Sequence, residues 1–191
     1  MHHDHAEDAR GLFRTLETGD SELAHRVASP RFSNREAVSG PPACALQGPA
    51  GLLASSAWLR SAFPELHLEI VDVDSVGART WVRLRMQGRQ SGTFVTFQDG
   101  RAARILPPTG RRIDVEQIHV LDMDDDGVAR HEAVRDDVTM LGQLGVLPPT
   151  PGLLLATLAG RLTGRSRRAV GNVVTAAERA AATAAPAPSG R

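Results

Sequence analysis

The sequence predicts an α+β fold in which a curved antiparallel sheet wraps around helices from the N-terminal part of the chain. Three observations predict it. Apolar residues in the first third recur at helical spacing, residues 65–135 alternate largely with a period of two, and Pro or Gly separates these segments. Helices that precede a run of antiparallel strands are typical of α+β folds. A cavity is expected between the two layers.

Three helices are expected before any strand. Residues 5–18 have the spacing of an amphipathic helix, a short second helix follows, and a third runs from residue 49 until Pro64. Residues 31–51 contain too many Pro and Gly residues for a regular element, so we predict a loop there. Three of its polar residues are expected near the rim of a cavity: Asn34, Arg35 and Glu36.

The strands are expected from Glu65 onward. Residues 66–73 alternate, with a slip near Val71 that indicates a bulge, and residues 76–86 repeat the pattern. Residues 88–110 are irregular apart from a short strand at 93–97. Two further strands, at 113–121 and 128–135, are joined by a hairpin turn at 122–127.

A charged strand end is followed by a short helix in the stretch RHEAVRDDVTMLGQLG, residues 130–145. Val138, Leu141 and Leu144 form one apolar stripe of this helix, and Gly145 ends it. An aspartate beside an apolar helix could have its pKa raised by a low-dielectric pocket and act as a base. The alternative is that Asp136 or Asp137 only caps the helix, which the residues by themselves favour.

The composition fits one globular domain with a tail. The 191 residues are 41% hydrophobic and 23% charged. We predict a principal domain over residues 1–149 and a helical extension, rich in Arg and Ala with a disordered end, over residues 150–191. The extension carries leucines and arginines that could touch an acidic lipid surface. We expect instead that its leucines pack on the barrel or on a dimer mate.

Charge and cysteine content narrow the function. Lys plus Arg and Asp plus Glu both number 22, which leaves no basic field for nucleic acid. Cys44 is the single cysteine, so neither a disulfide framework nor a cysteine-based zinc site is expected. The N-terminus lacks the apolar core of a signal peptide, and no stretch reaches the ~20 apolar residues of a membrane span. We expect a cytoplasmic protein without integral membrane association.

No metal site is predicted. DMDDDG at residues 122–127 imitates the start of a calcium loop, but its twelfth position is Ala133 and strands flank it. The N-terminal cluster His2, His3, Asp4 and His5 is expected to be a frayed end.

Three blocks carry a family resemblance: residues 34–66, PPTGRR at 107–112, and HEAVRDDVTMLGQLG with the following prolines at 131–149. They resemble the SnoaL-like polyketide cyclases and related ester cyclases, which belong to the nuclear transport factor 2-like superfamily. The resemblance implies a conical α+β barrel with a deep pocket, commonly dimeric through the convex side of the sheet. It also implies a cofactor-free intramolecular aldol condensation on a hydrophobic polyketide-like compound.

The resemblance assigns roles to particular residues. Asp136 corresponds to the general acid/base at the end of the last strand, which leaves Asp137 as the cap. His119, in line with core positions of its strand, could donate a hydrogen bond to an enolate oxygen. A satisfied core histidine is the alternative. Asn34 could orient a substrate carbonyl or simply form a turn.

Further substrate contacts are predicted at Trp58, Phe63 and Glu132. Family members often have tryptophan where this chain has Glu132, and commonly a histidine near Gln90. Alternation places Glu132 and Asp136 on one strand face, about 13 Å apart at ~3.3 Å per residue. The other face carries His131 and Arg135, which we predict to be structural or interfacial.

The sequence leaves two alternatives to a cyclase open. The same cone could hold an apolar ligand or a partner segment without catalysis. It could also hydrolyse epoxides, an activity of the superfamily that uses an Asp-Arg-Asp set. Arg83 or Arg85 would then have to face the pocket, since Arg135 and Asp136 lie on opposite strand faces.

Overall fold

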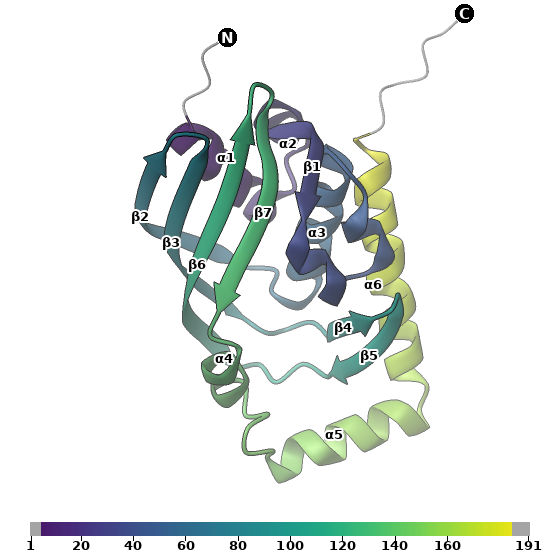
Figure 1. Cartoon of the computed structure of the whole chain (residues 1–191). Helices are drawn as coiled ribbons and strands as arrows, with labels where there is room; N and C mark the ends of the chain where they lie inside the picture. The colour runs from purple at the N-terminus through teal and green to yellow at the C-terminus, as the bar shows by residue number, and fades with distance from the viewer. Residues whose placement is uncertain (1–4, 185–191) are drawn as a thin grey trace, which may run out of the picture.

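The computed structural model describes residues 5–184 and has the predicted α+β architecture (Figure 1). A five-stranded sheet with the order β1-β7-β6-β3-β2 curves around α1 and α3, and a two-stranded sheet, β4-β5, lies beside it. The helices are α1 (His5–Thr18), α2 (Ser21–Val27), α3 (Pro49–Ala62), α4 (Asp137–Gln143), α5 (Pro151–Leu162) and α6 (Arg165–Ala182), with two short 3-10 helices, η1 (Arg35–Ser39) and η2 (Pro42–Ala45). The strands are β1 (Ala28–Asn34), β2 (His67–Val76), β3 (Arg79–Arg89), β4 (Phe94–Gln98), β5 (Arg101–Leu106), β6 (Arg112–Asp124) and β7 (Gly127–Arg135).

The main core lies between the concave face of the sheet and the helices. Phe13 of α1, Leu52 of α3 and Leu84 of β3 are fully buried there. These residues belong to the helical and alternating patterns read from the sequence, so the three N-terminal helices and the long strands are confirmed. The slip in β2 is confirmed as well, because its register with β3 shifts between Ile70 and Asp72.

Two strands were not predicted. β1 falls in the segment expected to be a loop, and it pairs in parallel with β7, with Asn34 opposite His131. It tolerates Pro30 because it is an edge strand. β5 has no alternating pattern and is largely exposed. Asp99 and Gly100 both have positive φ, 51° and 72°, which is the backbone that a tight hairpin turn requires.

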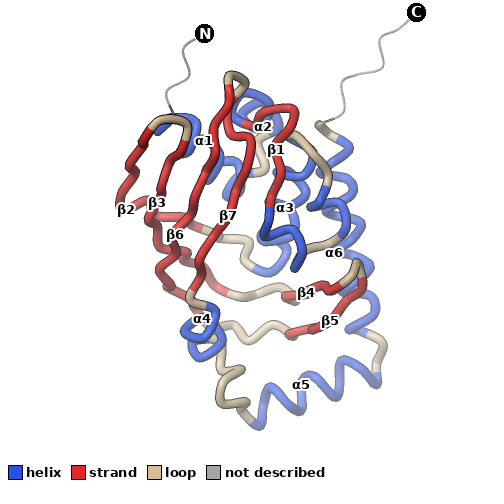
Figure 2. The backbone as a smooth tube through the Cα atoms, in the orientation of Figure 1, coloured by secondary structure: helices blue, strands red, loops and turns tan. Residues whose placement is uncertain are grey.

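The C-terminal helices differ in how they pack (Figure 2). α6 lies along α3 and buries the small residues Val173, Ala177 and Ala181 in a second core cluster that includes Trp58. None of the residues of α5 is fully buried. The expectation that its leucines pack on the barrel is therefore wrong for most of them within this chain. The expected disorder of the last residues concerns positions outside the described part.

Candidate active site

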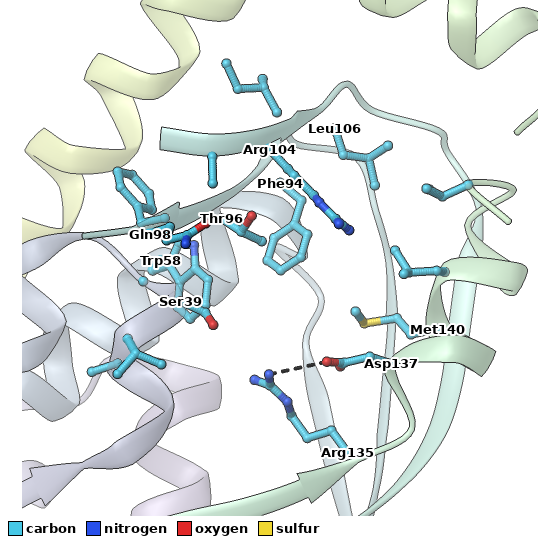
Figure 3. Close-up of a pocket in the computed structure, with 18 of the residues that line it drawn as sticks. Ser39, Trp58, Phe94, Thr96, Gln98, Arg104, Leu106, Arg135, Asp137 and Met140 are labelled. Atoms are coloured by element: carbon cyan, nitrogen blue, oxygen red, sulfur yellow. Dashed lines mark hydrogen bonds and ion pairs between the residues drawn. The ribbon is translucent and has the colours of Figure 1, made fainter. Parts of the chain in front are cut away.

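A pocket of about 980 Å³ opens between the hairpin β4-β5, the 3-10 helices and the segment that runs from the end of β7 to α5 (Figure 3). Its wall is mostly apolar, with Trp58, Phe94, Leu106 and Met140 pointing toward the same space. Its charged lining residues are Asp99, Arg104, Arg135 and Asp137. The pocket therefore combines a large apolar surface with a few charged groups, as small-molecule sites do.

Strand pairing decides which side chains of β7 face inward. Gln117 of β6 pairs with Arg135, and His119 pairs with Ala133. Partners across an antiparallel pair point to the same side of the sheet, and both β6 residues are buried on the concave side. Arg135 therefore lies on the inner face of β7. The predicted alternation is right, and the structure places His131 and Arg135, predicted to be structural or interfacial, on the concave side.

Arg135 pairs with two carboxylates, of which Asp137 lines the pocket and Glu36 does not. Its guanidinium lies 3.0 Å from Oε2 of Glu36 in η1 and 3.4 Å from Oδ2 of Asp137 at the start of α4. Oε1 of Glu36 also accepts the backbone N–H of Ala133 at 3.3 Å, which ties η1 to β7. The three side chains come from separate segments and carry one net negative charge. Arg135, Glu36 and Asp137 are the acidic and basic cluster that the sequence analysis missed.

Asp136 caps the helix instead of Asp137. Its Oδ1 accepts the backbone N–H of Thr139 at 2.9 Å, and its Oδ2 accepts the hydroxyl of Thr139 at 2.6 Å. These bonds hold the pKa of the exposed Asp136 carboxyl below its usual value, the hydroxyl bond most strongly. The expected rise of its pKa is therefore wrong, and so is the assignment of the cap to Asp137. The catalytic role of Asp136 stays a prediction.

A hydrogen-bonded chain of polar side chains crosses the interior. His131 Nδ1 lies 3.1 Å from Oδ1 of Asn34, and His131 Nε2 lies 2.7 Å from Nδ1 of His119. His119 Nε2 is 3.0 Å from the side-chain amide of Gln117. Because Oδ1 of Asn34 also accepts the backbone N–H of Glu36, the proton of His131 sits on Nδ1. When both rings are neutral, Nε2 of His131 accepts from Nδ1 of His119, whose Nε2 faces Oε1 of Gln117.

Burial keeps this chain neutral at ordinary pH. It lowers the pKa of His131 to about 4, and it lowers the pKa of His119 well below its usual value, with further contributions from His131 and Arg135. The edge of Phe13 packs on His119, with ring centroids 4.9 Å apart. Asn34 thus both forms the predicted turn and bonds to the interior chain. The contact of His119 and Asn34 with substrate stays a prediction, since neither lines the pocket.

The other predicted substrate contacts, Trp58, Phe63 and Glu132, lie in three different surroundings. Trp58 lines the pocket, donates from Nε1 to the carbonyl of Val95 at 2.8 Å, and stacks on Phe94. Phe63 is fully buried behind that wall, edge-on to Phe94. Glu132 faces the opposite way from Arg135.

The surroundings of Glu132 are basic. It forms ion pairs with Arg35, at 3.2 Å, and with Arg130. The structure therefore does not bring Glu132 together with the other candidates, and it is absent from the pocket wall. The hairpin register between residues 113–121 and 128–135 is the sequence signal that could have shown this, because it places Gln117 opposite Arg135.

Two kinds of feature are absent from residues 5–184. No group of three or more His, Cys, Asp or Glu side chains is arranged there to hold a metal ion. Over the same residues, every helix is too short or too polar to span a bilayer.

Comparisons with known proteins agree with this fold. The sequence profile of the SnoaL-like polyketide cyclases matches residues 7–144. Aklanonic acid methyl ester cyclase DnrD from Streptomyces peucetius is 29% identical over 143 residues, which cover 74% of this chain and 91% of that protein. Aklanonic acid methyl ester cyclase DauD from Streptomyces sp. (strain C5) is also 29% identical, over 74% of this chain and 82% of that protein.

Solved structures share the fold at lower identity. TsrD from Streptomyces laurentii superposes with a TM-score of 0.60 at 22% identity, over 75% of this chain and 98% of TsrD. A SnoaL-like polyketide cyclase from Agrobacterium tumefaciens superposes with a TM-score of 0.56 at 19% identity, over 75% of this chain and 100% of that chain. With the family profile matching well over half of its length, the chain belongs to the SnoaL-like polyketide cyclase family.

Proposed function

We propose that this protein is a cofactor-independent cyclase that closes a ring in a hydrophobic, polyketide-like carbonyl compound by acid/base catalysis. The observation that carries the proposal is the apolar pocket with the Arg135 and Asp137 ion pair on its wall. The family, SnoaL-like polyketide cyclases, and the two relatives, both aklanonic acid methyl ester cyclases, support the substrate class.

The proposed reaction is an intramolecular aldol addition. A carboxylate removes a proton from the carbon next to a carbonyl, and the enolate carbon attacks a second carbonyl of the same molecule. A carbon–carbon bond forms, the carbonyl π bond opens, and the new alkoxide takes the proton back. The product is an isomer of the substrate, so no redox partner is needed. Arg135 is positioned to stabilise an enolate oxygen near the pocket wall.

Two neighbouring carboxylates compete for the role of base. Asp136 is the predicted one, although its side chain is exposed and bonded to Thr139. Asp137 lines the pocket and is paired with Arg135. Substrate binding would have to release Asp136 from its cap for it to act. We keep Asp136 as the proposed base, and His119 and Asn34 as groups that position oxygens.

The test compares Asp136→Asn with Asp137→Asn, using aklanonic acid methyl ester as the probe and chromatography to separate an isomeric product of equal mass. We expect Asp136→Asn to lose turnover at least about 100-fold while its unfolding curve stays unchanged, since Asn also caps helices. Retained turnover in Asp136→Asn overturns that assignment. Unchanged ligand recovered from the unmodified protein overturns the cyclase proposal and supports a binding protein without catalysis.

A second candidate reaction is epoxide hydrolysis. Arg83 and Arg85 lie outside the pocket and pair with Glu116 and Asp114, so neither supplies the expected arginine. Arg135, however, lines the pocket and pairs with two carboxylates, which favours this reaction. An aryl epoxide incubated in oxygen-18 water should then yield a labelled diol, and a diol lacking the label, or none, removes the candidate.

We further propose a cytoplasmic homodimer formed through the convex side of the sheet. The exposed apolar residues Trp81, Ile118 and Val134 on that side support the dimer. Analytical ultracentrifugation of the full chain, with Ile118→Glu as the disrupting variant, tests it; a monomer at micromolar concentration overturns the dimer.

A further inference from the structure

The C-terminal extension builds part of the pocket wall. The family profile ends at residue 144, and the two solved structures described above match over nearly their whole length while covering 75% of this chain. The extension is therefore additional to the fold that they share. Three of its residues nevertheless line the pocket, Leu153, Leu154 and Thr157, and so do Val146 and Pro149 just before it.

α5 runs between α4 and α6, below the β4-β5 hairpin in Figure 1, and its residues Leu153, Leu154 and Thr157 line the pocket. Leu153 and Thr157, one helical turn apart, are partly covered on its inner side. Leu155 and Leu162 are 68% and 79% exposed and are absent from the pocket wall. The helix thus has two distinguishable sides, and the first charged residue along it is Arg161, in its last turn.

The wall that α5 completes also has apolar side chains from two other elements. Ile105 and Leu106 come from β5, and Met140 comes from α4. In Figure 3, Leu106 and Arg135 lie on opposite sides of the pocket. Hydrocarbon placed against these apolar side chains and Leu153 would leave water, although Arg104 of β5 and Asp137 of α4 also line the pocket.

We propose that α5 completes an apolar subsite for a hydrocarbon portion of the ligand, an alkyl chain or an aryl ring beyond the reacting carbonyls. The placement of the carbonyls toward Arg135 and Asp137 rests on the proposed function, whereas the subsite rests only on the apolar wall. Burial of each added methylene should raise affinity about fourfold until the subsite is filled.

The test measures binding without turnover. Acetyl-, butanoyl- and hexanoylnaphthalene are titrated against the full chain, and the gain in affinity per methylene is determined. In the double variant Leu153→Ser and Leu154→Ser, the gain should fall below about twofold because the wall becomes polar. The matched control, Leu155→Ser and Leu162→Ser, changes the same residue type on the other side of the same helix and should keep the gain.

The outcomes separate this inference from the cyclase proposal. An undiminished gain in the Leu153 and Leu154 variant, or an equal loss in both variants, overturns the subsite. A gain that depends only on Leu153 and Leu154 supports it, even if no isomeric product forms with any carbonyl probe. Because α5 has no fully buried residue, both variants should fold, and circular dichroism with thermal unfolding verifies this.

Discussion

His119 and His131 are stacked inside the cone, with 2.7 Å between Nδ1 of His119 and Nε2 of His131. Their rings are nearly parallel, at 11°, with centroids 5.0 Å apart. A bond between two ring nitrogens needs one proton, so the neutral pair is satisfied. A positive charge on either ring would be buried near Arg135, which is unfavourable.

The first prediction concerns acid stability. Both histidines have a lower pKa in the folded protein than in the unfolded chain, so the unfolded chain binds more protons in acid. Their contribution is fully present above about pH 6.5 and is lost as the pH falls. With a folded pKa of about 4 for His131, that residue alone accounts for about 3 kcal/mol by about pH 4. Urea unfolding across this range measures the loss.

Matched variants separate the buried pair from other titrating groups. His131→Gln should flatten the dependence of unfolding free energy on pH, because no buried imidazole remains at that position. His67→Gln, which removes an exposed histidine beside Glu17, is the control for loss of a histidine outside the buried pair. If His131→Gln keeps the slope of the unmodified protein, the buried pair is not its source.

The second prediction concerns the cap of α4. Asp136→Ala should lower the free energy of unfolding by about 1 kcal/mol, because two bonds to Thr139 are lost. Asp136→Asn should be close to neutral, since the amide oxygen can still accept the Thr139 N–H. Asp137→Ala removes no cap and should cost less than Asp136→Ala. Denaturant unfolding of the three variants measures these changes. A larger loss of unfolding free energy for Asp137→Ala than for Asp136→Ala would contradict the assignment of the cap to Asp136.

The third prediction concerns Gln90, which stands near the position where family members commonly have histidine. Its buried amide donates to the carbonyls of Gly92, Leu106 and Pro107 and accepts from Thr109 twice. It therefore holds the chain on both sides of the β4-β5 hairpin. Gln90→Ala should cost about 2–4 kcal/mol in unfolding free energy because several buried polar groups lose their partner.

The conservative variant Gln90→Glu distinguishes hydrogen bonding from packing. It keeps the shape and the acceptor but loses the donor to three carbonyls, so it should also destabilise strongly. If Gln90→Glu unfolds like the unmodified protein, the donated bonds do not hold the hairpin. The thermal midpoint of each protein, measured at one pH, gives this comparison.

The fourth prediction uses the two tryptophans of the chain. Trp58 lies on the pocket wall, whereas Trp81 is 46% exposed on the outer side of the sheet. In Trp81→Phe, the remaining indole should change its fluorescence when aklanonic acid methyl ester binds. In Trp58→Phe, binding should leave the fluorescence unchanged. The reverse pattern would place the ligand away from this pocket.

The order of elements could be predicted from the sequence because helical and strand periodicities are local properties of the chain. Leu12 and Phe13 in α1, and the alternation of β3 and β6, are of this kind. β1 and β5 carry no comparable pattern, since both are short and largely exposed on one or both faces. Their pairing depends on partners elsewhere in the chain.

The candidate site, too, could be predicted only in part from the sequence. The sequence by itself determined that Arg135 and Asp136 point to opposite sides, because successive residues of a strand alternate. Only packing in the tertiary structure decided which side is inside, and the pairing of Gln117 with Arg135 across the β6-β7 hairpin shows the result. The same long-range packing brought Glu36 to Arg135 and α5 to the pocket wall. These contacts join segments far apart in the chain, which local patterns cannot specify.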